Sequence, residues 1–175
     1  MKLNRPINLK SWIEKNRHLL KPPVGNKVVY ENSDFIIMVV GGPNSRKDYH
    51  VDPIEEFFYQ IEGDMNLKII ENGKRVDICI KEGEIFLLPK NIPHSPQRFV
   101  NTVGLVVEYK RAHGIPDYFQ WYCDSCDKLL HEVKVELKDI VKQLPKVFKK
   151  YWDDIPARTC GSCGEIQNPK YFNEN

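Results

Sequence analysis

Short apolar runs dominate the chain from residue 28 to residue 111. Some are continuous, and others alternate apolar with polar residues; most are bounded by Gly, Asn, Asp or Pro. Both patterns are typical of β-strands. The strands that we predict are Val28–Tyr30, Phe35–Val40, Phe57–Ile61, Met65–Ile69, Arg75–Ile78, Glu84–Leu88 and Val103–Tyr109. Because no helical pattern separates these short strands, the stretch predicts an antiparallel sandwich or barrel.

Two local signals sharpen this picture. The Asn72-Gly73 pair stands between two of the alternating segments, and both residue types tolerate the positive φ angles of a type I′ turn. It therefore predicts a tight hairpin. Before the strands, Asn8–Asn16 predicts a short helix with Asn8 as its N-cap, because Leu9, Trp12 and Ile13 recur on one helical face.

The pattern changes after residue 115. Val133 and Val135 alternate as in a strand, and a helical stripe of apolar residues follows, which comprises Leu137, Ile140, Val141, Leu144, Val147, Phe148 and Tyr151. We expect Pro145 to kink or split this helix, because proline lacks the amide donor and clashes with the preceding turn. We therefore predict two parts, a β domain with its N-terminal helix over residues 1–115 and an extension over residues 116–175.

Composition narrows the functional classes. The 175 residues, 41% of them hydrophobic, suffice for one sizeable core. A net charge of +2, without a clustered basic face, argues against a nucleic-acid partner. No apolar run reaches the roughly 18 residues of a membrane span. Without a secretory signal, the five cysteines predict reduced thiols and a cytoplasmic location.

Two histidines and a carboxylate on strand-rich segments are candidates for a catalytic metal site. His50 and Glu56 lie on either side of Pro53, and His94 follows a second proline-rich turn. Two imidazoles and one carboxylate can bind ferrous iron on one face and leave coordination positions open for chemistry. A single histidine is more often a packing residue, and a Glu55-Glu56 pair can be a solvated surface feature; their combination with the Gly and Pro spacing favours metal.

The cysteines predict a second metal site. Cys123 and Cys126 form one CxxC pair, and Cys160 and Cys163 form another. Two such pairs indicate a tetrahedral thiolate site of rubredoxin or zinc-ribbon type, which binds zinc or iron and leaves no open position. The alternative is a set of reduced structural thiols. Cys79, the fifth cysteine, is expected to pack within a strand.

The histidine segments resemble the two motifs of the cupin superfamily. His50-x5-Glu56-x6-Gly63 resembles the first motif, and Gly83-x5-Pro89-x-Asn91-x2-His94-x3-Arg98 resembles the second. The resemblance implies a cupin-type antiparallel β-barrel, or jelly roll. Three positions depart from the common cupin pattern. Asp52 replaces a second histidine, Asn91 replaces glycine, and Arg98 replaces asparagine.

Longer segments resemble a narrower family, the 3-hydroxyanthranilate 3,4-dioxygenases, over essentially the whole chain. They are Leu19–Val24, Val40–Asn44, Asp48–His50, Glu55–Gln60 and His94–Arg98. The resemblance implies an Fe(II)-dependent enzyme that opens the ring of 3-hydroxyanthranilate with O2. The product, 2-amino-3-carboxymuconate semialdehyde, cyclises to quinolinate in NAD biosynthesis from tryptophan. The family also implies a homodimer and, in its bacterial and fungal-type members, a four-cysteine metal site remote from the reaction.

The same resemblance assigns roles to three further residues. Arg98 is expected to bind the substrate carboxylate, Glu108 to accept a hydrogen bond or a proton from the substrate, and Arg46 to stabilise bound oxygen. Glu56, a metal ligand, is also expected beside the substrate. From spacing alone, Arg46 is more simply an exposed loop residue, and Glu108 can be an outward-facing residue of an alternating strand.

Two other functions remain open at this point. A sugar or keto-acid isomerase on the same fold would use the metal only as a Lewis acid, and O2 consumption separates it from a dioxygenase. A non-catalytic, metal-dependent sensor whose zinc ribbon contacts nucleic acid is the second alternative, which the near-neutral charge disfavours.

Overall fold

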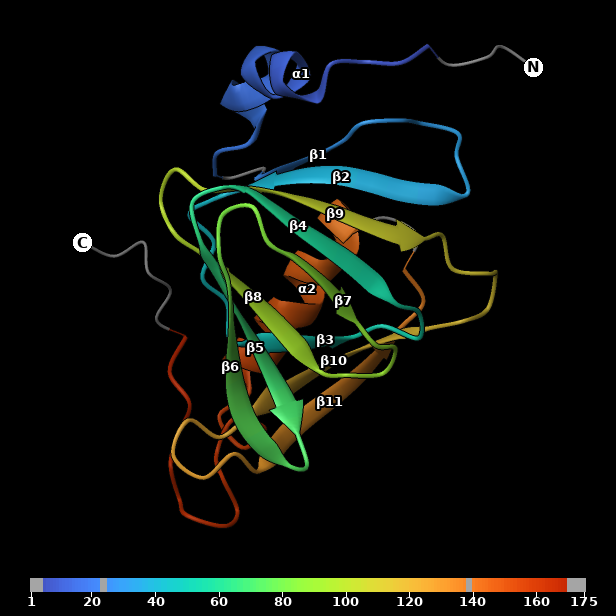
Figure 1. Cartoon of the computed structure of the whole chain (residues 1–175). Helices are drawn as coiled ribbons and strands as arrows, with labels where there is room; N and C mark the ends of the chain where they lie inside the picture. Colours follow the sequence, from blue (N-terminus) through green and yellow to red (C-terminus); the bar gives the residue numbers. More distant parts are fainter. Residues whose placement is uncertain (1–4, 23–24, 138–139, 170–175) are drawn as a thin grey trace.

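The computed structural model describes residues 5–22, 25–137 and 140–169, and the side chains of residues 140–142 are outside this description (Figure 1). Two helices and eleven strands are present in these residues, with a 3-10 turn, Arg17–Leu19, after the first helix. The elements are α1 (Leu9–Asn16), β1 (Asn26–Val28), β2 (Phe35–Gly41), β3 (Asp48–Val51), β4 (Glu56–Glu62), β5 (Met65–Glu71), β6 (Lys74–Ile80), β7 (Ile85–Leu88), β8 (His94–Arg98), β9 (Val103–Tyr109), β10 (Asp117–Tyr122), β11 (Leu129–Val135) and α2 (Ile140–Asp153).

The strands form two antiparallel sheets. The five-stranded sheet has the order β1-β2-β9-β4-β7, and the six-stranded sheet has the order β11-β10-β3-β8-β5-β6. Consecutive strands often lie in different sheets, so the chain crosses repeatedly between the two layers. The predicted class, a mainly β cupin-type barrel with two helices and a cysteine-bearing extension, is confirmed.

The interior between the sheets follows from the alternation of side chains along each strand. Along β5, Met65, Leu67 and Ile69 are buried and the residues between them are not. These side chains pack with Phe58 and Val106 of the other sheet in the main core cluster. The alternating pattern in the sequence thus identified which strand face meets the core.

Three strands were absent from the prediction. β3 and β10 carry polar residues among their apolar ones, and β8 contains Pro96. Such compositions lack the continuous or alternating apolar pattern that marked the other strands. At the other end of the barrel, β1 covers Asn26–Val28 rather than the predicted Val28–Tyr30. The missed β3 and β8 are the two strands that carry the candidate histidines.

The turns follow the predicted chemistry. Asn72 and Gly73 both have positive φ angles, 51° and 76°, between the paired strands β5 and β6. Asn91 has a φ of 63° in the turn before β8. Asparagine is enriched in this left-handed region, which explains how Asn91 can stand where the cupin motif usually has glycine.

The N-terminal helix forms as predicted. The Asn8 side chain accepts a hydrogen bond of 2.9 Å from the Ser11 amide, which caps the first turn of α1. Ile13 is buried against Val39 of β2 in a separate apolar cluster. This helix therefore covers part of the outer face of the five-stranded sheet (Figure 1).

The C-terminal helix is not split, so that alternative of the expectation is wrong, and a kink at Pro145 stays a prediction. α2 continues through Pro145 without being split. Pro145 lies near the beginning of the helix, so its missing amide removes one hydrogen bond of an early turn and leaves the later turns intact. Leu144, Val147, Phe148 and Tyr151 pack against the cluster that contains Phe119 and Trp121, while the predicted side chains of Ile140 and Val141 lie outside the described residues.

Two further expectations concern the domain boundary and Cys79. β10 and β11 follow residue 115 and yet extend the six-stranded sheet, so the boundary between residues 115 and 116 stays a prediction. Cys79 is exposed on β6, so the expectation that it packs within the strand is wrong. No helix in the described part of the chain is long and apolar enough to cross a membrane.

Candidate active site

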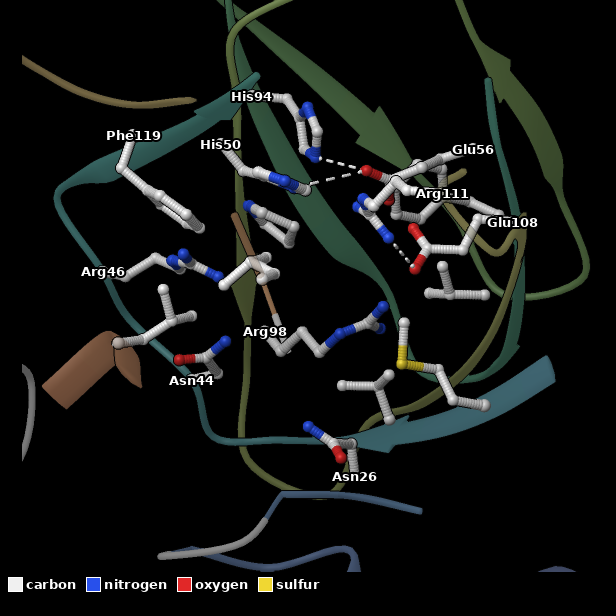
Figure 2. Close-up of a pocket in the computed structure, with 17 residues that line it drawn as sticks. Asn26, Asn44, Arg46, His50, Glu56, His94, Arg98, Glu108, Arg111 and Phe119 are labelled. Atoms are coloured by element: carbon white, nitrogen blue, oxygen red, sulfur yellow. Dashed lines mark hydrogen bonds and ion pairs between the residues drawn. The ribbon is translucent and has the colours of Figure 1, made fainter. Parts of the chain in front are cut away.

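The three candidate metal ligands meet inside the barrel. His50 of β3 and His94 of β8 are direct cross-strand partners in the six-stranded sheet, and Glu56 of β4 faces them from the other sheet (Figure 2). Glu56 Oε1 lies 2.9 Å from His94 Nε2 and 3.6 Å from His50 Nδ1. The side chains thus bring one nitrogen from each ring and one carboxylate oxygen within 4.8 Å of one another.

The other ring nitrogens determine which atoms can bind a metal. His94 Nδ1 is 3.0 Å from the Ile92 carbonyl oxygen, which can only accept, so Nδ1 carries the hydrogen. His50 Nε2 is 2.7 Å from Asp117 Oδ1 and donates to that carboxylate in the same way. When the rings are neutral, as metal binding requires, the unprotonated nitrogen of each therefore points toward Glu56, as in carboxylate–histidine–metal arrangements.

A divalent cation fits this arrangement. Glu56 Oε1 is buried and has no hydrogen-bond partner among the described residues. Burial raises the pKa of Glu56, but His94 and His50 outweigh burial and hold that pKa well below its usual range. Burial lowers the pKa of His50, whereas the neighbouring carboxylates of Asp117 and Glu56 raise it to about 9. A proton and a metal ion thus compete for the same convergent lone pairs.

A cavity of about 180 Å³ opens beside these ligands (Figure 2). Its apolar walls are Met38, Val40, Phe58, Pro96, Val106, Phe119, Leu137 and Leu144. Its polar lining consists of Asn26, Asn44, Arg46, His50, Glu56, His94, Arg98, Glu108 and Arg111. An apolar slot with a few convergent charged groups is typical of a site for a small, flat, charged molecule.

Arg98 provides a buried positive charge at this cavity. Its Nη1 donates to Gln60 Oε1 at 3.0 Å, and its Nε has no partner among the described residues. Burial lowers the pKa of Arg98 below the ordinary arginine value, because no carboxylate compensates the charge. A carboxylate entering the cavity would supply that partner through paired N–H···O contacts.

Glu108 lies in the cavity wall, and the alternative of an outward-facing residue is wrong. It is the cross-strand neighbour of Glu56 and is 5% exposed. Burial and the nearby Glu56 raise the pKa of Glu108, against the opposing effect of Arg111. Arg111 Nη1 donates to Glu108 Oε1 at 3.0 Å. Glu108 therefore binds a proton at a higher pH than an exposed glutamate does, which suits a group that accepts a proton.

Arg46 also lines the cavity, although its sequence context suggested an exposed loop. Its Nε donates to Asp48 Oδ2 at 2.9 Å, and its guanidinium lies over the Phe148 ring, 5.9 Å from the ring centroid. The backbone amide of Arg46 donates to Gln97 Oε1 at 3.3 Å. These contacts hold a positive charge at the cavity, next to α2 (Figure 2).

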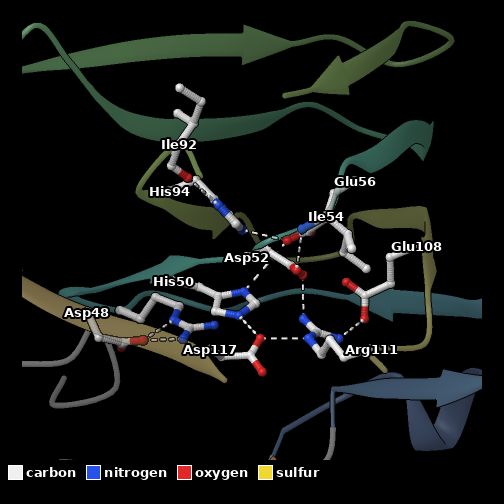
Figure 3. Close-up of polar contacts among 11 residues, drawn as sticks. Asp48, His50, Asp52, Ile54, Glu56, Ile92, His94, Glu108, Arg111 and Asp117 are labelled. Carbon is white, nitrogen blue, oxygen red and sulfur yellow. Dashed lines mark hydrogen bonds and ion pairs between the residues drawn. The ribbon is translucent and has the colours of Figure 1, made fainter. Parts of the chain in front are cut away.

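Sequence reasoning missed two polar residues of this site. Arg111 follows β9 and contacts carboxylates around the cavity, and Asp117 begins β10 and binds His50 (Figure 3). Asp52, noted only as a departure from the cupin pattern, pairs with Arg111, and burial raises the pKa of Asp52 to about 7 although Arg111 opposes the shift. Arginine and aspartate at strand ends also occur in ordinary loops, so no local pattern distinguished them.

The four cysteines of the CxxC pairs come together at the far end of the six-stranded sheet. Cys123 Sγ is 3.5 Å from Cys163 Sγ, and Cys126 Sγ is 3.6 Å from Cys160 Sγ; all four sulfurs lie within 4.8 Å of one another as free thiols. Metal–sulfur bonds of about 2.3 Å in a tetrahedron give sulfur–sulfur edges of about 3.8 Å. The four thiols therefore match a closed tetrahedral metal site.

Comparison with known proteins assigns the family. Residues 1–152 match the family model described as 3-hydroxyanthranilic acid dioxygenase. The chain belongs to the 3-hydroxyanthranilic acid dioxygenase family. It is 54% identical over 165 residues to the 3-hydroxyanthranilate 3,4-dioxygenase of Shewanella woodyi, covering 94% of this chain and 87% of the relative. It is 48% identical over 161 residues to that of Bacillus thuringiensis, covering 91% and 90% of the two chains.

Among solved structures, a cupin-2 domain protein from Shewanella frigidimarina matches with a TM-score of 0.49 and 18% identity, over 59% of this chain and 94% of that one. The 3-hydroxyanthranilic acid dioxygenase model spans every residue of the metal site and cavity described above, and it ends before Cys160 and Cys163. The match to the family model is thus independent of the second cysteine pair.

Proposed function

We propose that this protein is an Fe(II)-dependent 3-hydroxyanthranilate 3,4-dioxygenase, which opens the aromatic ring of its substrate with O2. The observation that carries the proposal is the convergence of His50, Glu56 and His94 beside a cavity that presents Arg98 and Glu108. The product is 2-amino-3-carboxymuconate semialdehyde, the precursor of quinolinate in NAD biosynthesis from tryptophan. Family membership and the relatives' names support this assignment.

The protein residues place the substrate. Arg98 binds the substrate carboxylate, which restores a counterion to the buried guanidinium. The apolar walls, among them Phe58 and Val106, hold the flat ring and exclude water. Glu108 accepts a hydrogen bond from the polar edge of the ring and takes the hydroxyl proton as the substrate ionises. The cavity thus fixes both the position and the protonation of the substrate.

The metal and Arg46 interact with O2 in this proposal. Ferrous iron held by His50, Glu56 and His94 would supply open coordination positions and a path by which electron density from the bound substrate reaches O2. Arg46 lines the same cavity and keeps a fixed positive charge where negative charge develops on oxygen. Each residue thus has a role that its position in the cavity allows.

The four-cysteine site has a structural role in this proposal. Cys123, Cys126, Cys160 and Cys163 would bind zinc or iron in a closed shell without an open position. Thiolate ligands must stay reduced, which supports a cytoplasmic location.

We further propose a homodimer that uses the outer face of the five-stranded sheet. Apolar residues are exposed there on three of the five strands: Ile85 and Leu87 of β7, Phe35 of β2 and Tyr109 of β9. β2 and β9 are adjacent, and β4 separates β9 from β7. The rings of Phe35 and Tyr109 lie 4.2 Å apart, which makes a continuous aromatic surface. A second copy of the chain would remove this surface from water.

Anaerobic loading with Fe(II), followed by 3-hydroxyanthranilate and air, tests the function. We expect one O2 consumed per substrate and an absorbing product that converts to quinolinate. His94→Ala, checked for folding and metal content, should lack turnover because one of three ligands is missing. Substrate turnover without O2 uptake would instead support an isomerase, and full activity of metal-quantified His94→Ala would exclude the metal site.

A further inference from the structure

Arg111 contacts three carboxylates with three different nitrogens (Figure 3). Nε donates to Asp117 Oδ1 at 2.7 Å, Nη1 donates to Glu108 Oε1 at 3.0 Å, and Nη2 donates to Asp52 Oδ2. The carboxylates come from β9, from β10 and from the segment between β3 and β4. The three contacts fix the plane of the guanidinium, because its donors point in set directions.

One branch of this arrangement reaches the metal site. Asp117 is fully buried, and its Oδ1 accepts from both Arg111 and His50. The positive charge of Arg111 keeps Asp117 ionised, so Asp117 Oδ1 can only accept hydrogen bonds. The facing atom of His50, Nε2, must therefore carry the hydrogen. In the neutral ring that binds a metal, Nδ1 of His50 is then the atom with the free lone pair, and it faces Glu56. Arg111 thereby fixes the ring orientation of a metal ligand that it does not touch.

The second branch reaches the substrate cavity. Arg111 binds only one oxygen of Glu108, Oε1, and the other makes no hydrogen bond to a described residue. That second oxygen is free for the polar edge of a bound molecule, because both residues line the cavity. Arg111 therefore sets the direction in which Glu108 presents its free oxygen.

Charge gives Arg111 a further role. Carboxylate oxygens of Asp52, Glu56 and Glu108, all buried, lie within 4.8 Å of one another. Three such groups attract a cation, and each repels the others when none is present. The Arg111 guanidinium, bound to Asp52 and Glu108, already supplies this positive charge. A second metal ion is thus not needed to hold the carboxylates together.

We propose that Arg111 is a positioning residue that acts through Asp117 on the His50 ligand and through Glu108 on the substrate. The inference rests on the proposed metal site, and it adds that one guanidinium sets the geometry of both halves of the site. A lysine at this position would keep the positive charge but could not reach three separate carboxylates along fixed directions.

Mn(II) binding to the metal-free histidine site tests this proposal without any turnover. Zinc is first placed on the four cysteines, because thiolates prefer zinc and manganese prefers oxygen and nitrogen ligands. Electron paramagnetic resonance of free Mn(II) then gives the dissociation constant. We expect Arg111→Lys to weaken Mn(II) binding by about 10-fold or more, as loss of support around a metal ligand usually does.

Arg75→Lys is the matched control. Arg75 is also a half-buried arginine with three contacts, to Tyr49, Asp127 and the Cys123 carbonyl, but none of these residues belongs to the histidine site. Even if Arg75→Lys lowers the free energy of unfolding as much as Arg111→Lys does, its Mn(II) dissociation constant should therefore stay within about twofold of the wild-type value. Equal weakening in Arg75→Lys and Arg111→Lys would reduce the effect to general destabilisation and overturn the proposal.

A double-mutant cycle tests the path of the effect. If Arg111 acts on His50 through Asp117, then Arg111→Lys should add nothing to the loss of Mn(II) affinity in Asp117→Ala. The same cycle with Glu108→Gln, read as kcat/KM of the iron-loaded enzyme, tests the substrate branch. Fully additive effects in both cycles would sink the proposal. Wild-type protein that binds no Mn(II) would instead overturn the proposed metal site itself.

Discussion

At the scale of single residues, hydrogen bonds on the far side of each imidazole decide where its lone pair points. The Ile92 carbonyl does this for His94, and Asp117 does it for His50. Both lone pairs converge on Glu56, so the site follows from backbone and carboxylate acceptors as much as from the ligands. In the cavity beside them, Arg98 Nε has no hydrogen-bond partner among the described residues, and Glu108 is bound by Arg111 through one oxygen.

The raised pKa of Glu108 predicts the acid limb of activity. The enzyme needs this carboxylate ionised to accept the substrate proton. Because burial and Glu56 raise its pKa, kcat/KM should fall on acidification at a higher pH than the ordinary glutamate pKa would give. Glu108→Gln should lower kcat/KM by about 10²-fold or more, and the remaining activity should no longer fall on acidification in this pH range. A pH profile of kcat/KM that is unchanged by the substitution would remove Glu108 from this role.

The sequence carried some of these residues and not others. His50, Glu56 and His94 stood out because turns and spacing framed them, and family resemblance added Arg46, Arg98 and Glu108. Arg111 and Asp117 could not be found this way. Their partners lie on strands distant in the sequence, and a charged residue at a strand end has the same local context whether it is buried or solvated.

At the scale of elements, the site depends on pairs of strands in register. β3 and β8 place His50 opposite His94, and β4 and β9 place Glu56 opposite Glu108. Short runs rich in apolar residues revealed β4 and β9 in advance. It could not reveal β3 and β8, because their inward positions carry metal ligands and Arg98 in place of apolar side chains.

The turn before β8 gives a prediction at this scale. Asn91 has a φ of 63°, and its amide donates to the Asp52 carbonyl at 2.7 Å. A β-branched residue is strained at such an angle, so Asn91→Val should lower the free energy of unfolding by about 1–3 kcal/mol, measured by urea titration. Asn91→Gly, which tolerates the angle, is the control and should stay close to wild type. Equal losses in both variants would show that backbone strain is not the cause.

At the scale of the whole molecule, one chain carries two candidate metal sites with opposite designs. The histidine site lies between the sheets beside a cavity, and the cysteine site joins two separate segments of the extension. Backbone amides of Cys163 and Ser162 lower the pKa of the Cys160 thiol to about 6, so Cys160 forms a thiolate more readily than Cys126 and Cys163, whose pKa values are raised.

Loss of the cysteine site should affect stability more than chemistry. Cys126→Ser should lower the metal content by one ion per chain and reduce stability by about 2 kcal/mol or more, which lowers Tm by about 4–8 °C for a chain of this size. Activity per bound catalytic iron should stay within about twofold at a temperature where the variant is folded. A large loss of kcat in folded, iron-loaded protein would contradict a purely structural role.

The proposed dimer gives a second prediction at this scale. Leu87→Lys places a charge in the exposed apolar face of β7, so sedimentation should show a monomer where the wild type is a dimer. Ile155→Lys changes a residue that is equally exposed but follows α2, and it should leave the dimer intact. Dimers of unchanged affinity in Leu87→Lys would place the interface elsewhere.

The division of the ligands between the two layers has a mechanical consequence. Both imidazoles belong to one sheet and the carboxylate to the other, so a bound ion would cross-link the two sheets. Separating the two sheets would break metal–ligand bonds, so a bound ion would stabilise the closed arrangement. Slow amide exchange in β3, β4 and β8 should therefore become slower still when the ion is added, while β11 at the sheet edge stays unaffected.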